Sequence, residues 1–327
     1  MKIALIVATV LLGLASPLRS MGQGRARLDT TVRLDLRGTV DLSLVSGRIT
    51  VRGWDSAVVR ILALTESGVL RFDATPSRLS LRAESESQRG SPRAEATYDV
   101  SVPRGTRLRL RAASGSVTAS GSQGEISATT IDGAIDVSGG RRQVALESVS
   151  GAVKASQLSG ELRAQSVSGN VRAENVSGRL EAVTISGTIR LTGLRANDIH
   201  AETASGDIVY AGRLATGGTY DFESHSGTIR LTVPSNSAAQ FRLEAFRGIV
   251  QTDLTAGAGP TERKGGRVEF TVGDGLAIVT ARTFSGRIVV KSDAASIIRR
   301  DSASIIRTDS GLTTRRDSAS ARRRDNN

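Results

Sequence analysis

The stretch "QSVSGNVRAENVSGRL" (residues 165–180) contains the same pattern twice, with its two Ser-Gly pairs nine residues apart. The step of nine continues on both sides, and Arg142 occupies one position where a glycine is expected. The glycines on this step are Gly115, Gly124, Gly133, Gly151, Gly160, Gly169, Gly178 and Gly187. A short fixed period predicts a repeat architecture, in which each unit buries its apolar side only against its neighbours.

The residues around each glycine alternate between apolar and polar, as in a β-strand. In the unit of Gly169, positions −2, +2 and +4 from the glycine are Val167, Val171 and Ala173. Successive side chains of a strand point to opposite faces. We therefore predict that positions −2, 0, +2 and +4 face the interior and that the serine and positions +1 and +3 face solvent. Other residues at position −2 are Val149, Leu158, Val176 and Ile185.

These units predict an all-β fold, a single elongated β-solenoid of stacked short strands. Two units per coil give an 18-residue coil, and three give 27 residues. With 18, Arg163 lies over Glu181 and Glu161 over Arg179, whereas with 27 Arg163 lies over Arg190. Charge pairing favours two strands per coil, but exposed ion pairs contribute too little to exclude the longer coil.

The N-terminus is typical of a secretory signal peptide, which we place at residues 1–26. A positive start at Lys2 precedes an apolar run over residues 3–15 and then small polar residues. Cleavage after Ser20 and cleavage after Ala26 both fit, and a buried strand or an uncleaved anchor is the alternative. The chain has no cysteine, so it has neither a disulfide framework nor a site for lipid attachment to a cysteine. We expect an exported protein that is periplasmic, at the cell surface or extracellular.

The C-terminal segment, residues 293–327, differs from the repeat. Its aspartates recur every eight residues, and residues 294–327 hold eight Arg and four Asp. This period suits neither a heptad nor the nine-residue unit. The segment is predicted to be a low-complexity, disordered Arg/Ser/Asp tail, which leaves residues 27–292 for the solenoid domain.

Three stretches combine Ser-Gly strands with particular turns. They are "VDLSLVSGRITVRGWDSAVVRILAL" (40–64), "YDVSVPRGTRLRLRAASGSVTAS" (98–120) and "TIRLTVPSNSAAQFRLEAFRGIV" (228–250). Together with the repeat, these features resemble the bacterial putative-adhesin family of β-strand-repeat proteins, a domain of unknown function with Val-Ser-Gly repeats. The resemblance covers about residues 30–291. It implies the fold and an adhesin-like role, and it transfers no catalytic residue.

The formal net charge of +12 and the pI of about 11.1 favour an anionic partner. With an 18-residue coil, Lys154, Arg172 and Arg190 stack into one basic column, which is the candidate surface for an anionic ligand. The alternative is that these residues belong to an ordinary solvated strand face.

The sequence offers little for catalysis or metal binding. It has only two histidines, and Ser224 and Ser226 are predicted to point away from His225 on the same strand. We therefore predict no catalytic, cofactor-binding or metal-binding residue and no enzyme. The leading hypothesis is an exported, adhesin-like binding module of the cell envelope, with anionic glycan as the ligand. The alternative is a structural or regulatory envelope protein that docks a protein partner or self-assembles. A polysaccharide-active β-helix enzyme comes third.

Overall fold

The computed structural model describes residues 6–7, 25–66, 68–84, 95–254 and 261–293. The predicted signal peptide lies outside these ranges except for strand β1 (Ile6–Val7) and residues 25–26, and the predicted tail lies outside them except for Asp293. The chain divides into two units, Met1–Ser292 and Asp293–Asn327, and the stacked strands belong to the first. In the described part of the chain, no helix long and apolar enough to cross a membrane is found.

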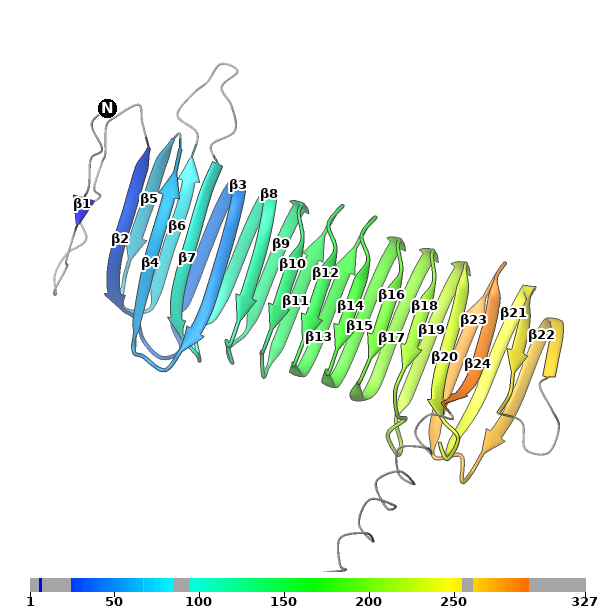
Figure 1. The fold of residues 1–327 in the computed structure, drawn as a ribbon. Helices are drawn as coiled ribbons and strands as arrows, with labels where there is room; N and C mark the ends of the chain where they lie inside the picture. Colours follow the sequence, from blue (N-terminus) through cyan, green and yellow to red (C-terminus); the bar gives the residue numbers. More distant parts are fainter. Residues whose placement is uncertain (1–5, 8–24, 67, 85–94, 255–260, 294–327) are drawn as a thin grey trace, which may run out of the picture. The chain divides into compact units, whose positions relative to one another are not determined.

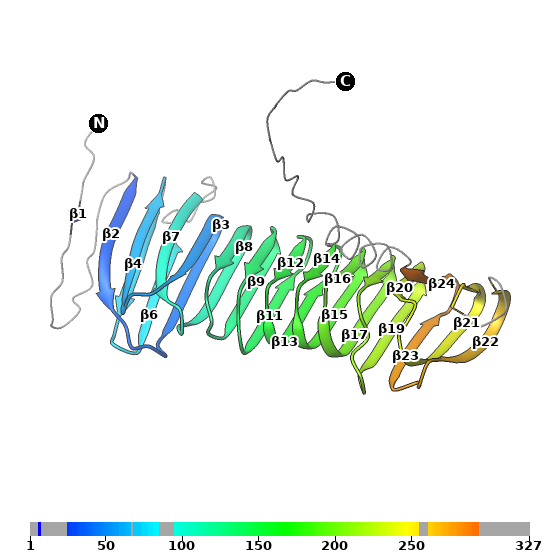
Figure 2. The same cartoon turned by 60° about the horizontal axis from the view of Figure 1, so that its bottom comes forward.

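The repeat forms a stack of two-stranded coils (Figures 1 and 2). Ile135 pairs in parallel with Val153, and Val144 with Leu162, each eighteen residues later. The all-β solenoid with two strands per coil is therefore confirmed. Its long-strand sheet contains β9 (Ile126–Asp132), β11 (Gln143–Ser148), β13 (Ser159–Ser166), β15 (Ser177–Ser186), β17 (Arg195–Ser205) and β19 (Thr219–Ser226). Its short-strand sheet contains β10 (Ile135–Ser138), β12 (Val153–Ser156), β14 (Val171–Glu174), β16 (Ile189–Thr192), β18 (Ile208–Ala211) and β20 (Thr228–Pro234).

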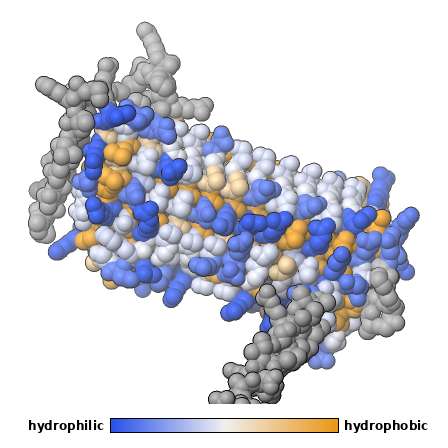
Figure 3. All heavy atoms as spheres, in the orientation of Figure 1, coloured by the Kyte–Doolittle hydropathy of each residue, from blue (hydrophilic) through white to orange (hydrophobic). Residues whose placement is uncertain are grey.

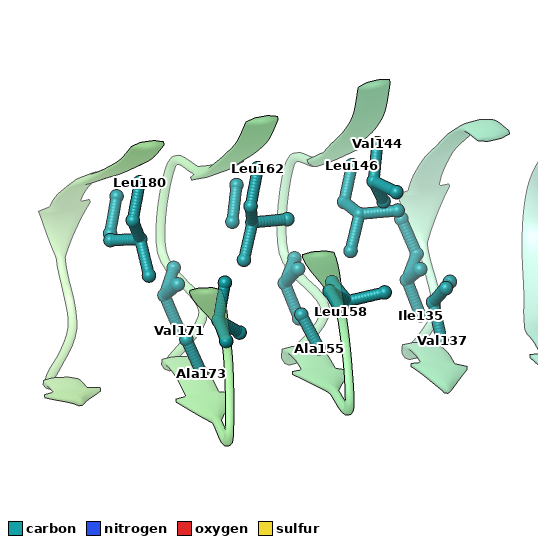
Figure 4. Packing of buried hydrophobic residues seen from close by; sticks show 14 of the residues in the cluster. Ile135, Val137, Val144, Leu146, Ala155, Leu158, Leu162, Val171, Ala173 and Leu180 are labelled. Atoms are coloured by element: carbon teal, nitrogen blue, oxygen red, sulfur yellow. The ribbon is translucent and has the colours of Figure 1, made fainter. Parts of the chain in front are cut away.

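The core is a narrow layer between these two sheets. Val144 and Leu146 point inward from the long-strand sheet, and Val171 and Ala173 point inward from the short-strand sheet, all at most 1% exposed (Figure 4). Small alanines alternate with branched residues along both sheets, so the sheets approach closely. The predicted inward positions +2 and +4 are confirmed in these coils.

The glycines of one edge lie directly over one another. A Cβ on Gly151, Gly169 or Gly187 would overlap the backbone carbonyl oxygen of the glycine in the preceding coil. At position −3 from each of these glycines, a buried Ser or Thr completes the edge. The Ser166 hydroxyl donates to the Gly151 oxygen (3.2 Å) and accepts from the Gly169 N–H (2.9 Å). The repeat therefore needs glycine because the coils meet backbone to backbone.

The prediction for position −2 is wrong at every second unit. Val149, Val167 and Ile185 are 46%, 44% and 54% exposed, while Leu158 and Val176 are buried as predicted. In the long strands, side chains alternate between the two faces up to the corner. Because the Ser or Thr at position −3 points inward, the next residue, at position −2, points outward. The short strands end one residue earlier relative to the glycine, at Ser156 in β12 and Glu174 in β14. The next residue, Gln157 (55°) or Asn175 (53°), has a positive φ. This turn directs the following apolar residue inward.

The stack therefore has two kinds of corner. We call the corners that follow the long strands the ridge corners and those that follow the short strands the groove corners.

The N-terminal end of the stack is closed by antiparallel strands. β3 (Thr39–Trp54) and β8 (Arg107–Ser120) each span both sheets and pair in parallel, and β3 also pairs with strands of the cap. The cap consists of β2 (Ala26–Arg33), β4 (Val58–Thr65), β5 (Val69–Ala74), β6 (Arg78–Glu84) and β7 (Glu95–Pro103). Leu28, Leu70 and Phe72 pack against the core there. The cap shields the apolar interior that an open coil would expose.

The C-terminal end closes with a hairpin. β21 (Ala239–Thr252) pairs in antiparallel fashion with β22 (Thr261–Val272), and Phe241 stacks on Phe270 at 4.9 Å. The chain then returns: β23 (Ala277–Thr283) lies between β19 and β21, and β24 (Arg287–Asp293) pairs with β20 and β21. The last strands are thus enclosed by earlier ones.

Candidate functional site

The structure brings the three residues of the predicted basic column into register on the short-strand sheet. Lys154 on β12 pairs with Arg172 on β14, which pairs with Arg190 on β16. Two of these cations have acidic neighbours. Lys154 Nζ lies 3.7 Å from Asp136, and Arg172 Nε lies 3.5 Å from Glu174. Only Arg190, which is exposed, has no ion pair with another described residue, so much of the column's charge is compensated.

A second basic surface lies beside this column, along the groove corners. An open groove follows these corners from Arg104 to Ala215. Arg141, Arg195 and Arg213 line it; all three are exposed, and none makes an ion pair with a described residue. Arg104 lies at one end and pairs with Asp55 at 2.6 Å. No Asp, Glu or His is among the described residues that line the groove.

The floor of the groove follows from the geometry of its corners. Leu158, Val176 and Leu194 are at most 4% exposed and lie under the turn. Beside them stand the residues that give the chain its left-handed turn, the amides Gln157 and Asn175 and the glycines Gly121, Gly139 and Gly193. Glycine and asparagine tolerate this conformation best. The groove therefore combines amide groups and accessible backbone with guanidinium groups along its sides.

Buried tyrosines hold the far end of the groove in place. Tyr210 donates its hydroxyl to the backbone oxygen of Arg213 (2.8 Å), and Tyr220 donates to Ala196 (2.9 Å) and accepts from the Ala215 N–H (2.7 Å). Burial raises the pKa of both hydroxyl groups, so both stay protonated donors at neutral pH. These hydrogen bonds fix the backbone that carries Arg213.

The groove arginines were not predicted as a site. The available signal was Arg141-Arg142, which stands where the nine-residue step expects glycine, together with Arg195 and Arg213 at the corners of later, lengthened coils. Arg195 lies 54 residues after Arg141, and Arg213 lies 18 residues after Arg195, so all three fall at the serine position of the nine-residue step. The period does not indicate that the chain forms a groove at this corner.

The ridge corners carry the second unusual surface, an exposed row of mostly apolar residues. In spatial order along the stack, the apolar row consists of Val45, Ala113, Ile131, Val149, Val167, Ile185, Ala204, His225, Phe284 and Phe246. On the face drawn in Figure 3, apolar residues reach the surface in a band along the stack. Position −2 of every second unit thus forms a continuous surface feature.

The histidines lie outside the groove and have structural neighbours. His200 lies 3.6 Å from both Glu202 and Asp221, and Arg282 lies 3.1 Å from Asp221. His225 stacks on Phe284, with ring centroids 4.9 Å apart. Within the described residues, no group of three or more His, Asp or Glu side chains is arranged to hold a metal ion.

Stacked two-strand coils, a glycine edge and antiparallel end caps define a β-solenoid repeat protein. Residues 100–291 match the profile of the Toastrack DUF4097 family, which is more than half of the chain, and the chain belongs to this family. The resemblance inferred from the Val-Ser-Gly repeats is thereby confirmed. Among curated proteins, no match to this chain was found.

Three solved structures show a distant similarity to this chain. A "putative lipid binding protein" from Parabacteroides distasonis is 11% identical, with 83% of this chain and 97% of that chain covered and a TM-score of 0.49. A "putative adhesin" from Bacteroides fragilis is 13% identical, with 81% of this chain and 97% of that chain covered and a TM-score of 0.41. A "putative cell adhesion protein" from Clostridium sporogenes is 9% identical, with 82% of this chain and 100% of that chain covered and a TM-score of 0.25. With TM-scores below 0.5 and identities of at most 13%, these structures determine neither the fold nor the function of this chain.

Proposed function

We propose that this protein is an exported, adhesin-like binding module of the cell envelope that holds an anionic glycan in its groove without chemical turnover. The observation that carries the proposal is the row of guanidinium groups of Arg141, Arg195 and Arg213, which make no ion pair with a described residue, along an open groove whose described lining contains no acidic residue. Guanidinium groups bind carboxylate, sulfate and phosphate oxygens through paired hydrogen bonds.

An elongated groove suits a chain-like ligand. It runs along successive coils, which lie about 4.8 Å apart, so one polymer can contact several coils at once. The amides of Gln157 and Asn175 add neutral hydrogen-bonding groups suited to sugar hydroxyls. Arg190, on the neighbouring strand face, extends the positive surface beyond the groove.

Binding without catalysis fits the residues present. Glycoside hydrolysis commonly uses a pair of carboxyl groups flanking the bond that breaks. The described lining of the groove supplies no carboxyl or imidazole group to act as acid or base. Turnover of an acidic glycan by the purified protein would contradict this part of the proposal.

The test measures binding of polygalacturonate, with neutral dextran as the comparison, at low and physiological salt. The chain is used with its tail and also cut after Lys291, because the tail is itself basic. We expect both forms to bind the acidic polymer in a salt-sensitive way and to ignore dextran. Binding by the tailed form alone would place recognition on the tail and overturn a groove site.

Three triple variants locate the site. Replacing Arg141, Arg195 and Arg213 with serine is expected to weaken binding about tenfold, since three exposed charge contacts of about 0.5 kcal/mol each are lost. Replacing the predicted column, Lys154, Arg172 and Arg190, is expected to have a smaller effect because two of its members have acidic neighbours. The control replaces three exposed arginines that lie outside the described groove lining and have no ion pair of 4.0 Å or less with a described residue: Arg60, Arg109 and Arg242. An equal loss in the control would reduce the interaction to net charge alone.

A further inference from the structure

We propose that two copies of this chain associate side by side through the apolar row of the ridge corners. This inference stands apart from glycan binding, because the row and the groove lie at different corners of the coil.

The apolar row is continuous because its members are neighbours in the backbone hydrogen-bond ladder. The Ile185 N–H donates to the Val167 oxygen (3.2 Å), and the Arg247 N–H beside Phe246 donates to the Phe284 oxygen (2.7 Å). With about 4.8 Å between adjacent coils, the row extends over roughly 43 Å. On most monomers, exposed apolar residues are scattered singly. A continuous exposed apolar row of this length is typical of an interaction site.

Around Val167 and Ile185, at the centre of the row, the flanking positions carry no charge. On the strand side, the outward residues two positions earlier are Gln165 and Val183, and the first charge on this side is Glu147 beside Val149. The other flank is formed by the residues on either side of the glycines. Ser150, Ser168 and Ser186 stand before the glycines, and Ala152, Asn170 and Thr188 stand after them. The nearest charged residues in these two columns are Asp132 and Asp207, each one coil beyond the three central coils. On a chain with a formal charge of +12, a neutral stripe is where a second copy meets the least repulsion. This absence of charge favours a like partner over a membrane, whose anionic lipids would attract basic flanks.

The aromatic end of the row argues against a sugar as its occupant. Phe284 stacks between His225 at 4.9 Å and Phe246 at 5.1 Å. Both faces of the central ring are therefore covered, whereas sugar binding needs an open ring face. Phe246 itself is 65% exposed and adds apolar area at this end.

Pairing through the row also separates the basic surfaces. The groove corners lie at the other side of each coil, so the two grooves of a pair face away from each other and remain open. A strip about 43 Å long and about 10 Å wide buries roughly 400–500 Å² per copy, or about 800–1,000 Å² in total, which is the range of weak, transient interfaces. We therefore expect a dimer that dissociates on dilution in the micromolar range.

The first test is sedimentation of the full chain over a concentration series at high salt. We expect a reversible monomer–dimer equilibrium. In the double variant Val167→Asp/Ile185→Asp, dimerisation should weaken at least tenfold, because like charges face each other in a stripe that loses water. The matched control, Leu64→Asp/Ile278→Asp, alters residues of similar exposure outside the row (43% and 40%) and should dimerise as the unchanged chain does. A monomer at all concentrations, or equal losses in both variants, would overturn the proposal.

The second test uses the absence of cysteine from the chain. A single cysteine at Val167, near the centre of the row, should form a disulfide-linked dimer under mild oxidation, because a disulfide needs the two Cα atoms within about 7 Å. The same change at Leu64 should not. Circular dichroism confirms that each variant folds. Failure of the folded Val167→Cys variant to cross-link would contradict pairing through the row.

Discussion

Glycine sets how closely the coils can stack at the ridge corners. Gly169 has the Gly151 carbonyl oxygen directly beneath the position of a Cβ, and this neighbour is backbone, which cannot turn aside. We expect Gly169→Ala to lower the free energy of unfolding by about 1–3 kcal/mol, as overpacking of a tight contact does. Denaturant unfolding measures the change. Ser168→Ala, at the exposed neighbouring position, serves as the control and should stay within about 0.5 kcal/mol.

The buried hydroxyl at position −3 holds the same corner. Ser166 both donates to and accepts from glycine backbone groups of two successive coils. In Ser166→Ala the Gly169 N–H loses its acceptor in a buried place, so we expect a loss of about 1–2 kcal/mol in unfolding free energy. Ser166→Thr should retain stability, since Thr184 makes the corresponding donation to Gly169 at 3.0 Å. Equal losses in both variants would mean that the hydroxyl does not matter.

For a strand and its corner, the sequence predicts the stacked coils more readily than whether the side chain of each corner residue points inward or outward. The glycine period and the apolar alternation predicted the strands and their stacking, and charge pairing favoured the 18-residue register that the structure has. Two units that look alike, Ser166-Val167-Ser168-Gly169 and Asn175-Val176-Ser177-Gly178, nevertheless place their valines on opposite sides. The distinguishing signal is residue −3: Ser or Thr continues the strand, whereas Asn or Gln adopts positive φ.

The proposed binding surface was predictable only in part. Register places Lys154, Arg172 and Arg190 in one column, as the 18-residue period indicates. Asp136 lies one coil before Lys154, and Glu174 lies two residues after Arg172 on the same strand. How far each carboxylate compensates the positive charge depends on side-chain distances, which a sequence period does not give. The count of nine does place Arg141, Arg195 and Arg213 on one phase, but the groove itself depends on corner backbone geometry, which a period does not give.

The N-terminal cap depends on one buried carboxylate that joins three strands. Asp41 on β3 is 2% exposed and lies 3.1 Å from Arg78 on β6 and 3.3 Å from Arg111 on β8. We expect Asp41→Asn to cost about 1–2 kcal/mol, because two charge-assisted hydrogen bonds weaken at once. Hydrogen exchange should show faster opening of β5 and β6. The control Asp55→Asn removes an exposed partner of Arg104 and should change stability by less than about 0.5 kcal/mol.

For the stack as a whole, the ends limit growth. β22 pairs only with β21 among the described strands, and its outer edge carries exposed Glu262, Arg263, Lys264 and Arg267. Charged residues on an edge strand oppose pairing with another chain. End-to-end polymerisation is therefore disfavoured at this end, and the uncharged apolar row along the side is the better surface for self-association.

The two-corner coil makes a prediction about the length of the whole stack. Deleting residues 151–168 removes one complete coil and joins Ser150 to Gly169, so each remaining strand meets a neighbour of its own kind. Deleting residues 151–159 removes one unit only. This shorter deletion places long strands next to short ones in the stack. Residues at the ridge-corner position, such as Val167, would then point into the core.

In a solenoid, stability is close to a sum over coils and their interfaces. We therefore expect the 18-residue deletion to keep the β-sheet circular dichroism spectrum and a single, somewhat lower unfolding transition. The nine-residue deletion should lose the cooperative transition. If both deletions fold equally well, the alternation of ridge and groove corners does not determine the register of the stack.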